Sequence, residues 1–526
     1  MTERATMGLV RSAVIMSVSA ALSRVLGFLR NTAISAQFGQ NQLADMLNTA
    51  FVIPDTIYLI LVGGGISSAF IPVLTGYLTE RNEKAVWNTV STAFNLVLLV
   101  VGLAIVMAML AAPLLVRLIA PGFNLEQVAY TAYLTRIVLV AILFHCLNGV
   151  LMGTEYAYQS FIGTAIGPLV YNAAIIVFGL ALSPKHSIAA FAISTLIGAI
   201  LNFMIQVWGV WRLRPRYLLI LDWQNSGIRR ILKLMLPVAI GLSITQLNLF
   251  FNQTFIASLL PRGSINALLL SSRVVMVPIA FAAAIGIALL PALSRIAAQK
   301  DYASFTHYLA GSLRTIIFIS LPATVGLIVL GQQVISILFQ HGRFTSSDTL
   351  VTTEALVFYA LGIVAYGAYE IISRAFYAIQ DTVTPLKIGL VTLAVGTSLN
   401  FTLGPFFGIR GLALAYSLAG FVNITLLIHY LQKKVQTPFA RQLLGTIIKS
   451  LLAALIMGFV VYFTNNFLAL PSTWPRLLRE GLELVLLIST GIVSYGFLAW
   501  LFKMEELTLM LTTIRRRLCR SHSAAA

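Results

Sequence analysis

The chain has 526 residues, of which 59% are hydrophobic and 10% are charged, and its mean hydropathy is +0.90. A soluble domain carries about 25% charged residues, so this composition excludes a soluble protein and predicts an all-α, polytopic membrane protein. The formal net charge of +18 is assigned to membrane orientation and anionic headgroups rather than to nucleic acid. The two cysteines, Cys146 and Cys519, form no disulfide framework or metal-binding pattern.

Long apolar runs follow one another along the whole chain. A run of about 20 residues can cross a bilayer as a helix, and the sequence predicts about fourteen such spans. No short apolar region with a cleavage site opens the chain, so the first span is expected to be uncleaved. The spans are expected near 8–36, 48–78, 86–116, 127–152, 158–182, 187–211, 228–258, 266–296, 309–339, 350–378, 384–404, 409–431, 443–467 and 478–502.

Lys and Arg are distributed unevenly over the predicted loops. The loops after even-numbered spans and the C-terminal tail are basic, whereas the loops after odd-numbered spans carry few cations. Cytoplasmic loops collect positive charge, so both termini are expected in the cytoplasm, as an even number of spans requires. The basic set comprises Arg81, Lys84, Arg212, Arg214, Arg216, Arg229, Arg230, Lys233, Arg295, Lys300, Lys433, Lys434, Arg441, Arg515, Arg516, Arg517 and Arg520.

Three sequence matches recur at an offset of about 220 residues, which indicates an internal duplication. Residues 71–74 resemble 290–293, residues 110–123 resemble 330–344, and residues 156–159 resemble 377–380. Six spans separate the partners, so the two halves have the same topology and form parallel repeats. We therefore expect an N-lobe (1–211), a basic cytoplasmic linker (212–230), a C-lobe (231–434), spans 13 and 14 (435–503) and a basic cytoplasmic tail (504–526).

A two-lobed bundle of this kind predicts a substrate site between the lobes and alternating access by rocking of one lobe against the other. Proline and glycine within spans either provide hinges or allow close helix packing. The triple glycine at 63–65 is expected to form a bend or an unwound turn.

Arginines at predicted membrane depth are the strongest functional signal. Arg24 and Arg30 lie in the first span and Arg273 lies in the eighth. A guanidinium stays ionised, and placing it at the bilayer centre costs roughly 2.5–3.5 kcal/mol on insertion scales. Arg24 and Arg30 either line an aqueous cavity or snorkel to the surface, and the apolar residues on both sides of them favour the cavity. Arg273 either lines the cavity or bonds a backbone carbonyl.

Acidic residues inside the spans are few. Asp45 at the start of the second span either pairs with one of the first-span arginines or caps its helix. Glu370 and Arg374 in the tenth span have i,i+4 spacing, which predicts an intrahelical ion pair.

Neutral polar residues give weaker signals. Asn248 and Asn252 share one face of the seventh span, and Asn400 lies in the eleventh. Interhelical hydrogen bonding is the default interpretation, and a sodium site is the alternative. His145 in the fourth span is interpreted as an interior histidine, with proton coupling as the alternative.

Several segments together resemble the MurJ (MviN) family of lipid II flippases, within the multidrug/oligosaccharidyl-lipid/polysaccharide exporter superfamily. The resemblance opens with Ser23-Arg24-Val25-Leu26-Gly27-Phe28-Leu29-Arg30 and extends over nearly the whole chain, including spans 13 and 14. The other matching segments are 38–39, 44–45, 69–72, 120–123, 167–168 with Asn172, 289–294, 342–345, 376–377, 380–381 and 384–385.

The resemblance implies transport of undecaprenyl-pyrophosphoryl-disaccharide-pentapeptide (lipid II) to the outer leaflet of the bacterial inner membrane through a cationic cavity. By position Arg24, Arg30 and Arg273 match the family's functional arginines, and Asp45 matches its acidic residue. The lipid tail is expected in a groove involving spans 13 and 14. Further candidates for coupling or gating are Ser23, Asn252, Asn400, Glu370 and Arg374. Family polar residues are replaced here by Asn31, Tyr58, Asn266 and Met276.

No cofactor or metal is expected, and coupling to the membrane potential or to a monovalent cation stays open. The expected partners are lipid II, membrane lipids and cell-wall synthesis proteins, and the chain is expected to be a monomer. No GxSxG, HExxH, Walker A or DxD motif is present, so an enzyme has little support. The alternatives are an exporter of another lipid-linked oligosaccharide or of small molecules, a membrane enzyme acting on polyprenyl phosphates, and a transport-inactive scaffold for cell-wall assembly.

Overall fold

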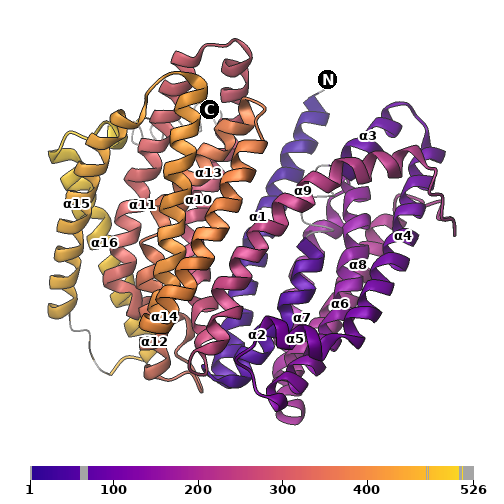
Figure 1. The fold of residues 1–526 in the computed structure, drawn as a ribbon, viewed down its shortest axis with the longest axis horizontal. Coiled ribbons are helices and arrows are strands. Elements are labelled where there is room, and N and C mark those ends of the chain that lie inside the picture. The colour runs from indigo at the N-terminus through magenta and orange to yellow at the C-terminus, as the bar shows by residue number, and fades with distance from the viewer. Residues whose placement is uncertain (1–2, 60–68, 469–470, 472, 509–511, 513–526) are drawn as a thin grey trace. The chain divides into compact units, whose positions relative to one another are not determined.

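The computed structural model describes residues 3–59, 69–468, 471, 473–508 and 512. Side chains are described over the same ranges except at 3–14, 236–242, 244–245, 248–249 and 441. Every regular element in these ranges is a helix (Figure 1), which confirms the predicted fold class. The triple glycine at 63–65 lies outside the described residues.

The helices follow the predicted apolar runs. The first part of the chain forms α1 (Glu3–Phe38), α2 (Gln42–Tyr58), α3 (Ile71–Thr79), α4 (Glu83–Leu110), α5 (Ala112–Ile119), α6 (Leu125–Ala157), α7 (Ile162–His186) and α8 (Ala189–Trp211). After the linker come α9 (Ser226–Phe250), the π-helical turn η3 (Phe251–Phe255), the 3-10 turn η4 (Ala257–Leu259), α10 (Ser264–Ala298), α11 (Tyr302–Phe339), α12 (Ser346–Ala360), α13 (Ile363–Ala378), α14 (Val383–Val435), α15 (Ala440–Phe467) and α16 (Arg476–Leu501).

Nine of the described helices are long and apolar enough to cross a membrane, or up to ten if α12 and α13, bent by 45°, form one span. The 53-residue α14 is interrupted at Gly408 (φ 58°, ψ −136°), so it covers the eleventh and twelfth predicted spans. Helices α1, α2 with α3, and α9 lie at the positions of the first, second and seventh spans. These helices are consistent with fourteen spans, and the exact count stays a prediction.

The helices pack into two compact units. The first unit contains Met1–Asn266 and His341–Thr345, and the second contains Ala267–Gln340 and Ser346–Ala526. In the first unit α8 packs against α6 and α7, and in the second α11 packs against α12, α13, α15 and α16. Packing thus places α9 with the first unit, whereas the predicted lobe boundary at 212–230 rests on the sequence and stays a prediction.

Backbone turns recur at the offset of the predicted internal duplication. The helix ends at Gln159 (φ 56°) and Gln380 (φ 59°) both adopt the left-handed conformation that side chains other than glycine seldom take. The breaks at Ser187 (φ 50°, ψ −137°) and Gly408 (φ 58°, ψ −136°) are nearly identical. Both pairs are 221 residues apart, so these two turns of the first unit recur in the second.

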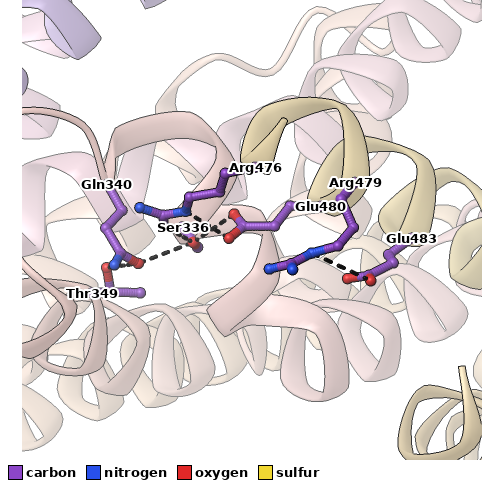
Figure 2. Close-up of polar contacts among 7 residues, drawn as sticks. All are labelled: Ser336, Gln340, Thr349, Arg476, Arg479, Glu480 and Glu483. Atoms are coloured by element: carbon purple, nitrogen blue, oxygen red, sulfur yellow. Dashed lines mark hydrogen bonds and ion pairs between the residues drawn. The ribbon is translucent and has the colours of Figure 1, made fainter. Parts of the chain in front are cut away.

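Hydrogen bonds join α16 to α11 within the second unit (Figure 2). Near the end of α11, the Ser336 hydroxyl accepts a hydrogen bond from Arg476 Nη2 at 3.1 Å, and Arg476 Nε pairs with Glu480 at 2.7 Å. Arg479 pairs with Glu483 at 3.9 Å. Glu480 and Glu483 of α16 are therefore both in intrahelical ion pairs.

The loop between α13 and α14 contains an ion pair that predicts acid sensitivity. Asp381 accepts hydrogen bonds from Lys434 Nζ and from the Thr384 amide. Burial by itself raises the pKa of Asp381, but the bonds from Lys434 and Thr384 and the Lys434 charge outweigh it, so the pKa lies below the ordinary value of 3.8. The pair therefore stabilises the folded state above about pH 4, and its contribution is lost as the pH falls through the depressed pKa.

We expect Asp381→Asn to lower the free energy of unfolding by up to about 1 kcal/mol at neutral pH, the upper range for an exposed pair. Below the depressed pKa the variant and the wild type are expected to be equally stable. Unfolding in detergent micelles as a function of pH measures the difference, and a difference that persists in acid would contradict the assignment.

Candidate functional site

Helix α1 carries the first two arginines and is held against α7 by a polar contact. The Asn172 amide donates to Ser23 Oγ at 3.3 Å and to the Pro168 carbonyl at 3.1 Å. Gly27 lies beside it, where a Cβ would be 3.8 Å from Asn172 Oδ1. Ser23, predicted as a coupling or gating residue, is therefore part of the contact that orients α1.

Arg24 is exposed and Arg30 is half-buried. The Arg30 guanidinium acts electrostatically on His145 of α6 and on Tyr171 of α7, and it is a hydrogen-bond partner of Tyr171. The rings of His145 and Tyr171 meet edge to face with centroids 4.8 Å apart, and Tyr58 of α2 contacts His145 at 5.8 Å. Aromatic and polar side chains from three helices, α2, α6 and α7, thus form a cluster at Arg30.

This cluster extends the sequence prediction. His145 lies between two aromatic rings, as expected for an interior histidine, and one of these rings is Tyr58. Tyr171 is the residue that sequence reasoning missed. The sequence gives one indication that Tyr171 belongs to the site, which is its position one turn after Gly167-Pro168. An aromatic residue in an apolar span does not by itself indicate function.

Asp45 corrects two predictions. Its Oδ2 accepts a hydrogen bond from the Gly263 amide at 2.6 Å and its Oδ1 accepts one from the Asn266 amide at 2.8 Å. It is therefore neither paired with an arginine in the described contacts nor the cap of its own helix, which is Asn41. Asp45 instead caps the start of α10, because the first amides of a helix lack intrahelical partners and favour an anionic acceptor.

Asn48 and Gly263 also contribute to this junction. Asn48 Nδ2 donates to Asn266 Oδ1 at 3.0 Å. Gly263 has φ 90°, and a Cβ there would lie 2.8 Å from the Gln40 carbonyl oxygen. The carboxylate, the amide pair and the glycine together fix the backbone at the start of α10.

The second unit contains Arg273 and the predicted acidic pair. Arg273 is half-buried on α10, two residues after Ser271, whose hydroxyl donates to the Thr352 carbonyl of α12 at 2.7 Å. Glu370 and Arg374 on α13 form the predicted i,i+4 ion pair at 2.9 Å. Arg24 and Arg30 belong to the first unit and Arg273 to the second, so their convergence on one cavity stays a prediction.

The asparagine candidates are buried. Asn252 lies in the π-helical turn η3, and Asn400 lies in α14. π-Helical turns are frequent at functional sites. The side chain of Asn248 lies outside the described residues, and among the described residues no group of three or more His, Cys, Asp or Glu could hold a metal ion. The sodium alternative therefore stays untested.

Comparison with known proteins gives a consistent family. The family model described as "Lipid II flippase MurJ" matches residues 34–475. The chain is 30% identical over 472 residues to a "Probable lipid II flippase MurJ" of Buchnera aphidicola, covering 88% of this chain and 91% of that protein. It is 28% identical over 514 residues to a "Lipid II flippase MurJ" of Burkholderia cenocepacia, covering 94% and 96%.

Solved structures agree. A lipid II flippase MurJ in an inward closed conformation matches with a TM-score of 0.78 at 27% identity, covering 94% of this chain and 99% of that chain. An inward-facing multidrug resistance MATE family transporter of the MOP superfamily matches with a TM-score of 0.67 at 13% identity, covering 80% and 98%. The second likeness concerns the fold alone.

Proposed function

The chain belongs to the MurJ family of lipid II flippases, and on that premise we propose that Arg24, Arg30 and Arg273 bind the pyrophosphate of lipid II while it crosses the membrane. The chain is a multi-pass membrane protein and a transporter rather than an enzyme, and its substrate is lipid II. Alternating access moves the head group, and the three arginines supply the cationic lining.

The observation that carries this proposal is the setting of Arg30. The Arg30 guanidinium acts on His145 and Tyr171, and the Asp55 carboxylate acts on Tyr171 from the same cluster. Among the described residues, no ion pair joins Arg24 or Arg30 to a carboxylate. Planar guanidinium groups bind phosphate oxygens in bidentate fashion. The Arg30 guanidinium is therefore available to bind the pyrophosphate of the substrate.

Asp45 has a positioning role in this proposal. It fixes the first amides of α10, the helix that carries Arg273. Glu370 pairs with Arg374, so this pair contributes rigidity to α13, and Ser23, Asn252 and Asn400 are proposed to take part in gating or coupling.

The remaining assignments follow from the sequence. The chain acts as a monomer in the bacterial inner membrane. Both of its termini lie in the cytoplasm, because the loops after even-numbered spans and the tail are basic. Helices α15 and α16 hold the lipid tail, which is supported by exposed apolar side chains along α15, namely Phe459, Phe463 and Phe467. The membrane potential or a monovalent cation drives the cycle.

Lipid II accessibility in reconstituted vesicles tests the function. The wild type is expected to expose lipid II on the opposite leaflet, with a rate that depends on an imposed membrane potential. Arg273→Ala is expected to reduce this rate to the protein-free background with or without the potential. Transport by Arg273→Ala at the wild-type rate would refute the role of this arginine, and absence of transport by the folded wild type would favour a scaffold.

A further inference from the structure

We propose that Glu155, near the end of α6, is a buried proton-binding site of the first unit, and that its protonated carboxyl closes the junction of α6, α7 and α8. This assignment is independent of the arginine roles proposed above. It concerns a residue that neither the cationic cavity nor the gating candidates use.

Glu155 is completely buried, with 0% of its surface exposed. Its Oε2 accepts a hydrogen bond from the Thr164 amide at 2.9 Å, and its Oε1 accepts a longer one from the Gly163 amide at 3.2 Å. Both amides belong to the first turn of α7, where backbone donors lack intrahelical partners. The carboxyl group therefore bridges the end of α6 to the start of α7.

Two glycines hold this carboxyl group tightly. A Cβ at Gly163 would lie 2.7 Å from either carboxyl oxygen, and a Cβ at Gly209 of α8 would lie 2.1 Å from Oε1. The backbones of α7 and α8 thus pack directly on the carboxyl, which leaves no room for the oxygen shell that a metal cation requires. A proton is the one positive charge that fits.

Unpartnered amides line the neighbouring turn of α8. Gln206, one turn before Gly209, is fully buried, and both its Oε1 and its Nε2 lack a partner. Gln206 Nε2 and Asn202 Oδ1 lie 3.0 Å and 2.1 Å from the point that a Cβ at Gly167 would occupy. Oε1 of Glu155 faces Gly209 of α8, and within the proposal the unpartnered Gln206 Oε1 one turn away is the acceptor assigned to the carboxyl proton.

Among the described side chains, no ion pair joins Glu155 to a charged group, and its hydrogen bonds come from backbone amides. Helix α8 contains no titratable residue, and Arg212 at its end lies over the Trp208 ring at 5.2 Å. On α6 itself, Glu155 acts electrostatically on Tyr156, and the Tyr158 hydroxyl donates a hydrogen bond to Glu83 of α4 at 2.6 Å.

Helix α7 packs against α6 and α8, and α1 packs against α7. The titratable residues of α7 are Tyr171, which belongs to the Arg30 cluster, and Lys185 and His186 at the opposite end of that helix. Of the described side chains of α1, Met16 contacts the first turn of α7: its sulfur accepts a hydrogen bond from the Thr164 hydroxyl. The two amide bonds from α7 favour the anion, but ionising a fully buried carboxyl that has no cation beside it among the described side chains costs more, so the neutral form is favoured.

The second unit provides an internal control. The turn after Glu155 is repeated 221 residues later, where the Asp381 amide bonds the Phe376 carbonyl as the Ser160 amide bonds the Glu155 carbonyl. At the same offset Gln206 corresponds to Leu427. Phe376 and Leu427 are fully buried in one apolar core. The fold therefore makes this junction without polar groups, and the carboxyl and amide of the first unit are a separate feature.

Infrared difference spectroscopy of the purified full-length protein tests the assignment directly. At neutral pH we expect the carbonyl stretch of a protonated carboxylic acid in the wild type and its loss in Glu155→Gln. Glu126→Gln is the matched control, because Glu126 is exposed on the same helix, and it should leave the band unchanged. Gln206→Leu, the residue found in the second unit, should keep the band but shift its frequency because the hydroxyl loses its acceptor.

Thermal unfolding gives a second readout. Because the folded chain would bind one more proton than the unfolded chain, wild-type stability should fall as the pH rises, and this slope should be reduced in Glu155→Gln. Identical spectra of the wild type and Glu155→Gln would overturn the proposal, as would loss of the band on replacing choline by sodium. If Glu155→Gln fails to fold, an unshifted band in Gln206→Leu would overturn it. None of these measurements uses lipid II, so they are separable from the transport test.

Discussion

Replacing Arg30 by alanine is expected to reduce lipid II transport by roughly 30-fold to several-thousand-fold, while the protein remains folded in the membrane. Truncating one partner of a buried, hydrogen-bonded charge pair costs about 2–5 kcal/mol, and each 1.36 kcal/mol is about tenfold in rate. Arg30→Ala removes the charge at the centre of the Tyr58, His145 and Tyr171 cluster. The vesicle accessibility assay measures the loss.

The chemistry of the replacement refines this prediction. Arg30→Lys keeps the charge but loses the planar fork that binds two phosphate oxygens at once, so it should transport at an intermediate rate. Arg214→Ala, which removes an exposed cation in the linker, is the control and should transport at the wild-type rate. Equal transport by Arg30→Ala and Arg214→Ala would exclude Arg30 from pyrophosphate binding.

Replacing Asp45 by alanine is expected to lower the free energy of unfolding by roughly 2–6 kcal/mol. The substitution leaves the Gly263 and Asn266 amides without their acceptors, and each buried donor left unsatisfied costs about 1–3 kcal/mol. Asp45→Asn keeps one carbonyl oxygen and should lose less. Unfolding in detergent micelles measures these differences.

Asp222 offers a control for this experiment, because it is exposed and accepts a local bond from the Gln224 amide. Asp222→Ala should change stability by no more than about 0.5 kcal/mol. If Asp45→Ala were as stable as Asp222→Ala, the cap on α10 would not hold that helix start. A stable Asp45→Ala that failed to transport would instead indicate a direct role of the carboxylate with the cargo.

The sequence by itself determined the helical membrane fold, the positions of most spans and the internal duplication. These features depend on the length of apolar runs and on short turn segments, which are local properties of the chain. The matched turns at Gln159 and Gln380 follow from such a segment, and so does the ion pair of Glu370 with Arg374, whose spacing places both on one helix face.

Only the tertiary structure decided the partners of the polar residues. Asp45 meets amides 218 and 221 residues away, Tyr171 joins Arg30 from another helix, and Glu155 closes on two glycines of α7 and α8. A hydrogen bond in a membrane protein depends on which helix faces meet and how closely their backbones approach. Residue type and spacing fix where a polar group lies along its own helix, whereas packing fixes what it binds.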